Sequence, residues 1–297
     1  MHESAPIGII GLGLMGTALS GRLIGAGVPV IGFDIDPASC ERLQAGGGTV
    51  AKSVRELADR AGAIVIAVHS GEQVEELFGA LEDGAGAARP TVICTTTCAP
   101  DEIIRLARRA SDAGLPLVEA PISGTSAELR DGTATALVAG EGEAVESAQA
   151  LLRVLCPRSI RVGTIGNASR TKLAINLILQ NNRAALAEGI AFAESLGLDG
   201  RAFLAAARES AAWSHVMETK GEKMLTRDFR PQSYISQTLK DAELILGEAR
   251  RRGLLLPLTT TQAELLRAAI AIEGPDSDSA AVIEAIRPRP AASWASR

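Results

Sequence analysis

The residues best suited to proton chemistry lie in segment 172–180, which reads Lys-Leu-Ala-Ile-Asn-Leu-Ile-Leu-Gln. On an α-helix, Lys172, Asn176 and Gln180 recur every fourth residue, so their side chains share one face. The rest of the segment is apolar, which predicts a helix buried on most sides. Because an unpaired ammonium group is costly to bury, this polar row predicts the wall of a polar cleft. A lysine there, with its pKa lowered by burial, can take up and release a proton.

A glycine-rich motif near the start, Gly11-Leu12-Gly13-Leu14-Met15-Gly16, predicts what occupies that cleft. It follows an apolar run and precedes a helical pattern, the context in which such a loop binds a dinucleotide pyrophosphate. Asp34 ends the second predicted strand, where a carboxylate accepts hydrogen bonds from ribose hydroxyls and repels a 2′-phosphate. The next residues are Ile35 and Asp36, and neither is an arginine that could bind a 2′-phosphate, so we favour NAD over NADP as the cofactor. A turn or helix-capping role for Asp34 is compatible with these observations.

The elements that position these residues follow two patterns. Up to about residue 164, short apolar runs alternate with helical stretches, which is typical of an open, mostly parallel sheet wrapped by helices. From about residue 166, helical periodicity dominates. We therefore predict a Rossmann-type doubly wound α/β domain at 1–164 and an all-helical substrate and dimerisation domain at 165–297. The expected strands are 7–10, 28–33, 63–68, 91–94, 116–119, 135–139 and 160–162, and the expected helices are 17–26, 38–45, 54–60, 100–113, 143–155, 173–196, 201–210, 233–252, 258–272 and 279–286.

Composition limits the partners and the location. The net charge of -5 and the 3% content of aromatic residues argue against a nucleic-acid-binding protein. No apolar run is long enough to span a membrane, and the first residues lack the basic region of a signal peptide. The four cysteines have neither disulfide-framework nor zinc-site spacing. We expect a cytoplasmic protein with reduced thiols and no metal site.

Several separated motifs together resemble the β-hydroxyacid dehydrogenases, a family that includes 3-hydroxyisobutyrate dehydrogenase and tartronate semialdehyde reductase. Besides the glycine loop, the Thr-Thr-Cys-Ala-Pro segment 96–100 is similar to the family's Ser-Thr-x-x-Pro, and the Ala-Pro-Ile-Ser-Gly-Thr segment 120–125 to its substrate motif. Segment 166–176 resembles the catalytic segment, which places the family's lysine at Lys172. Lys240-Asp241 resembles the Lys-Asp pair of the helical domain, and 278–282 the closing motif.

The resemblance implies an NAD-dependent oxidoreductase that transfers a hydride between nicotinamide and the alcohol carbon of a small β-hydroxyacid, or reduces the matching semialdehyde. It implies that Lys172 is the general acid and base, and that Asn176 holds the reacting oxygen or orients Lys172. Ser123-Gly124-Thr125 would bind the substrate carboxylate. Lys240 would close over the cofactor or the substrate, with Asp241 positioning it. The family also implies a homodimer or homotetramer joined through the helical domains.

Other roles are open for these residues. Lys172 can be a lysine that extends its amine to solvent at a helix start, and Asn176 a structural amide. Ser123 can be a helix N-cap, and the Lys240-Asp241 pair can be an exposed ion pair.

Four departures from the family pattern concern the cofactor and substrate sites. Ile175 stands where asparagine is usual, Thr125 replaces a glycine and Ser233 replaces a phenylalanine. All three are expected in or near the substrate pocket, and the changes at Thr125 and Ser233 predict a reshaped pocket and a substrate larger or more polar than 3-hydroxyisobutyrate. Val68-His69 replaces the usual Leu-Pro near the cofactor, and the resemblance places Thr97 at the nicotinamide end. Histidine titrates near neutrality, but His69 replaces a residue without a catalytic role.

Two other functions compete with this interpretation. One is a reductase of a non-acid substrate such as an imine, which Lys172 disfavours because related imine reductases generally have another residue there. The other is a non-catalytic protein that binds NAD or a hydroxyacid. The presence of both Lys172 and Asn176 disfavours this second function as well.

Overall fold

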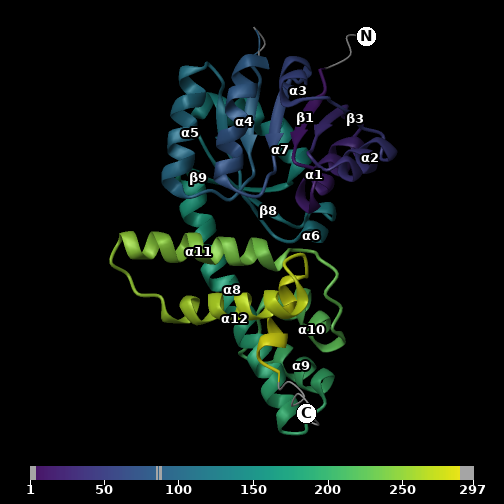
Figure 1. Cartoon of the computed structure of the whole chain (residues 1–297), viewed down its shortest axis with the longest axis vertical. Helices are drawn as coiled ribbons and strands as arrows, with labels where there is room; N and C mark the ends of the chain where they lie inside the picture. Colours follow the sequence, from purple (N-terminus) through teal and green to yellow (C-terminus); the bar gives the residue numbers. More distant parts are fainter. Residues whose placement is uncertain (1–4, 85, 87–88, 288–297) are drawn as a thin grey trace, which may run out of the picture. The chain divides into compact units, whose positions relative to one another are not determined.

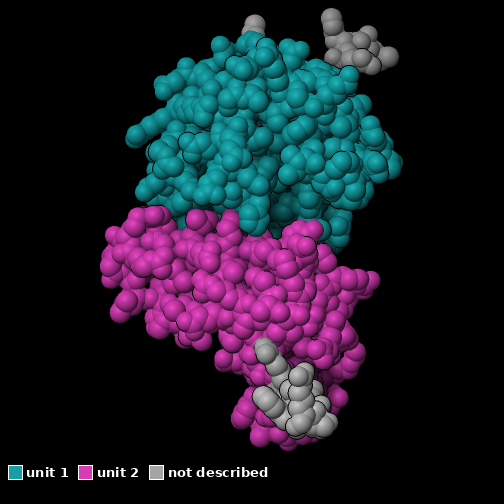
Figure 2. All heavy atoms as spheres, viewed as in Figure 1, with its two compact units in different colours: residues 1–173 teal, residues 174–297 magenta. Residues whose placement is uncertain are grey.

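The computed structural model describes residues 5–84, 86 and 89–287, and the chain forms two compact units. Unit 1 comprises residues 1–173 and unit 2 residues 174–297 (Figure 2). The division falls within one helix, α8 (Asn167–Ser195), whereas the domain boundary expected from the sequence, between residues 164 and 165, lies just before it.

Unit 1 is built on one sheet with helices on both sides (Figure 1). The strand order is β3-β2-β1-β4-β5-β6-β8-β7, and β9 also pairs with β8. Strands β1 to β6 are parallel, while β8 is antiparallel to β6 and β7. The strands are β1 (Ile7–Ile10), β2 (Val30–Phe33), β3 (Thr49–Val50), β4 (Ala63–Ile66), β5 (Thr91–Cys94), β6 (Leu117–Glu119), β7 (Ile122–Ser123), β8 (Thr135–Ala139) and β9 (Arg158–Gly163).

Side-chain alternation along the strands gives unit 1 two apolar cores. Ile9 packs in the same cluster as Leu19 and Leu152, whereas its neighbour Ile10 packs with Leu57 and Phe78 on the opposite face. Both faces of the sheet are therefore covered, which confirms the predicted doubly wound α/β fold. The helices of unit 1 are α1 (Leu14–Gly25), α2 (Pro37–Ala45), α3 (Val54–Arg60), α4 (Gly71–Gly84), α5 (Pro100–Asp112), α6 (Ser126–Arg130) and α7 (Gly142–Leu155).

Unit 2 is helical, as predicted. Its elements surround one apolar core that includes Ile190, Leu204, Met224 and Leu266. They are the remainder of α8, α9 (Gly200–Arg208), a π-helical turn (Met217–Gly221), α10 (Glu222–Thr226), α11 (Ile235–Arg251), α12 (Pro257–Glu273) and a 3-10 helix (Ser279–Ala285). Among the described residues, no helix has the length and hydropathy needed to cross a membrane.

Helix α8 corrects one expectation from the sequence. Its polar row is buried, with Lys172, Asn176 and Gln180 each no more than 6% exposed, whereas the apolar Ile178 and Phe192 are 60% and 65% exposed. The expectation that apolar side chains would bury this helix on most sides is therefore wrong. The side chains that it buries include the polar ones, and part of its apolar surface faces outward.

Candidate active site

The glycine loop between β1 and α1 has room for a phosphate group. Gly11 has a φ of +89°, and a Cβ there would lie 2.6 Å from the carbonyl oxygen of Ala67. At Gly16 a Cβ would lie 1.8 Å from the oxygen of Gly11, so only glycine allows the helix to pack this closely. A Cβ on Gly13 would meet nothing within 4 Å, and Gly13 begins α1 without a side-chain cap. The open space at the positive end of α1 fits a dinucleotide pyrophosphate.

Asp34 supports this loop from the end of β2. Its Oδ2 accepts a hydrogen bond of 2.5 Å from the backbone N–H of Leu12, and its Oδ1 accepts one of 2.8 Å from Asp36. Helix α2 is capped by Asp36, which accepts from the N–H groups of Ala38 and Ser39, so Asp34 is not the cap. A carboxylate has about four acceptor positions. Asp34 therefore retains capacity for ribose hydroxyls while it holds the loop.

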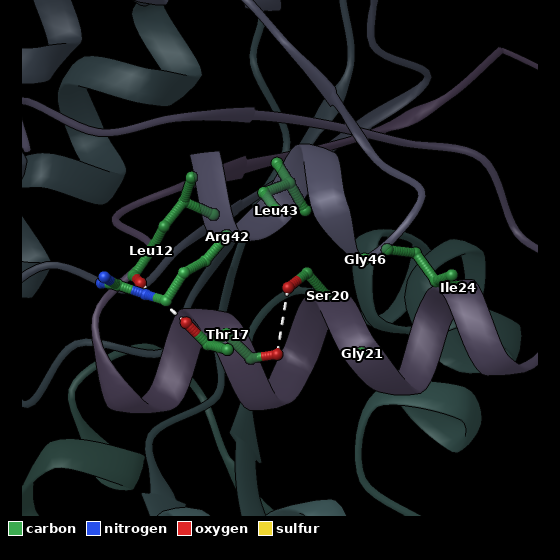
Figure 3. A pocket seen from close by; sticks show the side chains of 8 residues that line it. All are labelled: Leu12, Thr17, Ser20, Gly21, Ile24, Arg42, Leu43 and Gly46. Atoms are coloured by element: carbon green, nitrogen blue, oxygen red, sulfur yellow. Dashed lines mark hydrogen bonds between the residues drawn. The ribbon is translucent and has the colours of Figure 1, made fainter. Parts of the chain in front are cut away.

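Arg42, in helix α2, is a cation that follows Asp34 in the chain, beyond Ile35 and Asp36. Its guanidinium donates to Ser39 Oγ at 2.7 Å and lies 3.7 Å from Asp36 Oδ2. Arg42 also lines a hollow of about 100 Å³ between α1 and α2 (Figure 3). Of the predicted cofactor residues, only Leu12 lines this hollow, and the hydroxyls of Thr17 and Ser20 bond to carbonyls of their own segment. It is too small for a dinucleotide, and we regard it as a packing gap.

The other predicted cofactor residues follow β4 and β5. The Thr96 hydroxyl accepts from the Val68 N–H at 3.1 Å and donates to the Val68 carbonyl at 3.0 Å, which joins the two loops. Thr97 comes next and is 8% exposed, and the His69 N–H donates to Gln73. Strands β2, β1, β4 and β5 are adjacent and parallel. Their carboxyl ends therefore bring the glycine loop, Asp34, Val68-His69 and Thr97 to one edge of the sheet, where open α/β sheets bind ligands.

The loop with the predicted substrate residues follows β6 at the same edge. Thr125 rather than Ser123 is the N-cap of α6. Its hydroxyl accepts from the Glu128 N–H at 3.2 Å, and its own N–H donates to the Glu128 carboxylate at 2.7 Å. The polar groups of Thr125 thus stabilise the loop itself. Substrate contact by Ser123, Gly124 and Thr125 stays a prediction.

Lys172 lies in the part of α8 that belongs to unit 1, and Glu119 ties this helix start to the same edge. Glu119 ends β6, and its two carboxylate oxygens accept from the N–H groups of Gly166 at 2.7 Å and Ser169 at 2.5 Å. This contact could not be predicted from the sequence, because a glutamate at the end of a strand is equally compatible with an exposed side chain.

In unit 2, the structure joins three predicted site residues in one chain of contacts. Asn176 Nδ2 donates to Asp241 Oδ2 at 2.8 Å, and Lys240 Nζ lies 3.0 Å from Asp241 Oδ1. The Lys240 and Asp241 side chains are 16% and 9% exposed, so the alternative of an exposed ion pair is wrong. Asn176 Oδ1 is buried and has no partner among the described residues.

The buried polar row on α8 continues past Gln180 to Arg183, which was not predicted from the sequence. Gln180 Nε2 donates to the Thr238 carbonyl at 3.1 Å, and the Arg183 guanidinium lies 3.5 Å from the Thr238 hydroxyl. Burial lowers the pKa of Arg183 to about 10, while Asp278 and Asp241 act in the opposite direction. Arg183 is therefore a cation at neutral pH, and it belongs to the same helix face.

Ser233, which replaces the family's phenylalanine, takes part in a buried ion pair. Lys220 Nζ donates to Asp278 Oδ1 at 2.7 Å, to Asp278 Oδ2 at 2.8 Å and to Ser233 Oγ at 3.1 Å. All three ammonium donors are thus used. Burial lowers the pKa of Lys220 to about 8, against the opposing effect of Asp278. The serine hydroxyl therefore has an internal partner that a phenylalanine would not provide.

Comparison with known proteins assigns the chain to a family. Residues 6–165 match the NAD binding domain of 6-phosphogluconate dehydrogenase, and residues 166–286 match a domain described as NAD-binding of NADP-dependent 3-hydroxyisobutyrate dehydrogenase. The chain belongs to the β-hydroxyacid dehydrogenase family. It is 32% identical to 2-hydroxy-3-oxopropionate reductase of Escherichia coli, with 94% of this chain and 96% of that protein covered. It is also 32% identical to L-threonate dehydrogenase of Cupriavidus necator, with 94% and 95% covered.

Two solved structures are similar to the chain over nearly its whole length. A 3-hydroxyisobutyrate dehydrogenase from Salmonella typhimurium superimposes with a TM-score of 0.87 at 26% identity, covering 95% of this chain and 99% of that one. Psf3, in complex with NADP+ and 2-OPP, gives a TM-score of 0.87 at 25% identity, with 94% and 99% covered. The predicted family and fold are confirmed, and the chain is an NAD(P)-dependent oxidoreductase of the hydroxyacid dehydrogenase type.

Proposed function

We propose that the chain interconverts a small β-hydroxyacid and its semialdehyde with NAD as cofactor, and that Lys172 carries the proton. One observation carries the proposal. The carboxyl edge of the unit 1 sheet collects the glycine loop, Asp34, Thr97 and the 120–125 loop, and Glu119 ties the helix start that bears Lys172 to that edge. A hydride acceptor site and a proton carrier are thus provided by one side of one unit.

Each group has a defined task in this proposal. Bound nicotinamide supplies the hydride chemistry. Neutral Lys172 accepts the hydroxyl proton during oxidation, and its ammonium form returns a proton during reduction. Asn176 keeps its Nδ2 on Asp241 and offers Oδ1 to the reacting hydroxyl or to Lys172. Ser123 and Gly124 hold the substrate carboxylate.

The preference for NAD is argued from Asp34. A fixed carboxylate at the end of β2 accepts from ribose hydroxyls and repels a 2′-phosphate. The nearby Arg42 is already paired with Ser39 and Asp36. The family also includes NADP-dependent members, so the preference depends on this chain's own residues at the end of β2. No contact in the described residues specifically favours an imine substrate or a non-catalytic role.

The test is NADH formation with a panel of hydroxyacids that includes 3-hydroxyisobutyrate, glycerate and L-threonate. Lys172→Ala should lower the turnover number by about a hundredfold to ten-thousandfold, the range typical of a lost acid–base group. NADH binding should change little, because the glycine loop and Asp34 are untouched. Lys52→Ala removes an exposed lysine of unit 1 and serves as the control. Turnover of Lys172→Ala within about threefold of the parent would exclude Lys172 as the proton carrier.

A further inference from the structure

Glu119 is a buried carboxylate that the proposed proton transfer does not use. It is 0% exposed and is the last residue of β6, directly before the 120–125 loop. Its hydrogen bonds to Gly166 and Ser169 reach 47 and 50 residues along the chain. No cation of the described chain forms an ion pair with it. The Gly166 N–H directly precedes α8 and the Ser169 N–H belongs to its first turn, where such donors lack partners within the helix.

The energetics argue that this carboxylate is held in place for its geometry. Burial raises the pKa of Glu119, while hydrogen bonds from Ser169, Gly166 and Ala168 act in the opposite direction. A local serine or aspartate cap satisfies a helix start at less desolvation cost. A glutamate from a distant strand does something that a local cap does not, because it fixes the helix start to the strand that leads into the substrate loop.

We propose that Glu119 is a positioning residue for Lys172. It sets the first turn of α8, and with it Lys172 one turn later, relative to the 120–125 loop. A displacement of about 1 Å between reacting groups can cost about a hundredfold in rate. The proposal rests on the proposed role of Lys172, since positioning matters only if that lysine reacts.

The variant Glu119→Gln keeps one acceptor oxygen but turns an amide NH₂ toward a backbone N–H. We expect the turnover number to fall by at least about tenfold, with the Kd for NADH within about twofold of the parent. Glu119→Asp keeps the charge on a shorter side chain and should give an intermediate turnover number. Glu82→Gln is the matched control, because Glu82 also uses both carboxylate oxygens, on Arg109 in unit 1, and contacts no predicted site residue. It should lower the Tm without lowering turnover.

A double-mutant cycle separates positioning from simple stabilisation. If Glu119 acts through Lys172, adding Glu119→Gln to Lys172→Ala should leave the residual turnover unchanged within about twofold. Independent reductions that multiply in the double variant would overturn the inference, as would parental turnover in folded Glu119→Gln. If Glu119→Gln does not fold, the same cycle is run with Glu119→Asp. Full activity of Lys172→Ala would instead refute the proposed function, so the two failures are distinguishable.

Discussion

Replacing Asp34 by asparagine tests how the chain selects its cofactor. The carboxylate accepts from Leu12 at 2.5 Å and from Asp36 at 2.8 Å. Asparagine retains one acceptor oxygen and loses the charge. A hydrogen bond to a charged group contributes about 1.5–3 kcal/mol. The loop contact affects both cofactors equally, so it cancels in the ratio of their affinities.

Two terms remain in that ratio. NADH loses a charged acceptor for its ribose hydroxyls, which weakens binding by about 1.5–3 kcal/mol. NADPH escapes repulsion of about 1 kcal/mol per unit charge at about 4 Å in water, or about 2 kcal/mol for a doubly charged phosphate. Salt screens the exposed part of this repulsion. We therefore expect the NADH-to-NADPH affinity ratio to fall by about 10- to 150-fold where salt removes most of the repulsion, with about 5000-fold as the upper limit for the unscreened sum of about 5 kcal/mol.

Fluorescence titration of NADH and NADPH measures this ratio without knowledge of the substrate. The parent should bind NADH at least about tenfold more tightly than NADPH. Glu82→Gln removes a paired carboxylate elsewhere in unit 1 and should leave the ratio unchanged. Equal affinities in the parent would refute Asp34 as the selector. If Asp34→Asn lowers the affinity for NADH and for NADPH equally, then Asp34 only supports the glycine loop and does not select the cofactor.

Three further predictions concern stability and assembly. Lys220→Met leaves the buried Asp278 carboxylate without its counter-ion and should cost about 3 kcal/mol or more in urea unfolding; a loss below about 1 kcal/mol would contradict this. Ser233→Ala and Ser233→Phe both remove the hydroxyl that accepts from Lys220, but the structure must also accommodate the larger phenylalanine ring, so Ser233→Phe should destabilise more; equal losses would contradict this. The exposed Ile178 and Phe192 lie two heptads apart on α8 and give the helix an apolar face that a second subunit can cover. We therefore expect light scattering to give at least twice the 30.8 kDa mass of one chain, and Phe192→Glu to lower the measured mass. A monomeric parent would refute this prediction. Burial raises the pKa of Glu119 above its ordinary value of 4.5, so the folded chain keeps the Glu119 proton to a higher pH than the unfolded chain does. The unfolding free energy of the parent relative to Glu119→Gln should therefore fall as the pH rises from about 4.5 through the folded-state pKa. A difference that stays flat or rises would contradict the burial argument.

The cofactor loop and the helix with Lys172 were predictable because their signals are local. The glycine spacing and the four-residue interval of the polar row each fit within a few turns of chain. Helix α4 carried a similar signal, with Val74, Phe78 and Leu81 at helical spacing, yet it was not among the predicted helices. The two-residue strands β3 and β7 are too short to show alternation.

The missed polar residues depend on contacts that spacing does not encode. Glu119 finds its N–H donors 47 and 50 residues away, and Lys220 finds Asp278 58 residues away. Lys220 lies in the polar stretch Glu-Thr-Lys-Gly-Glu-Lys, which reads as a solvated surface. The π-helical turn and the neighbouring core bury it to 2% exposure, and only the folded unit shows this.

The long separation between Lys220 and Asp278 has a consequence for biosynthesis. The lysine leaves the ribosome 58 residues before its counter-ion. At about 5–20 residues per second, the delay is about 3–12 s. During that interval the native position of Lys220 would hold an unpaired ammonium, which disfavours final packing of unit 2. A nascent chain that stops before Asp278 should therefore remain an open, protease-sensitive client of chaperones, even after unit 1 has emerged.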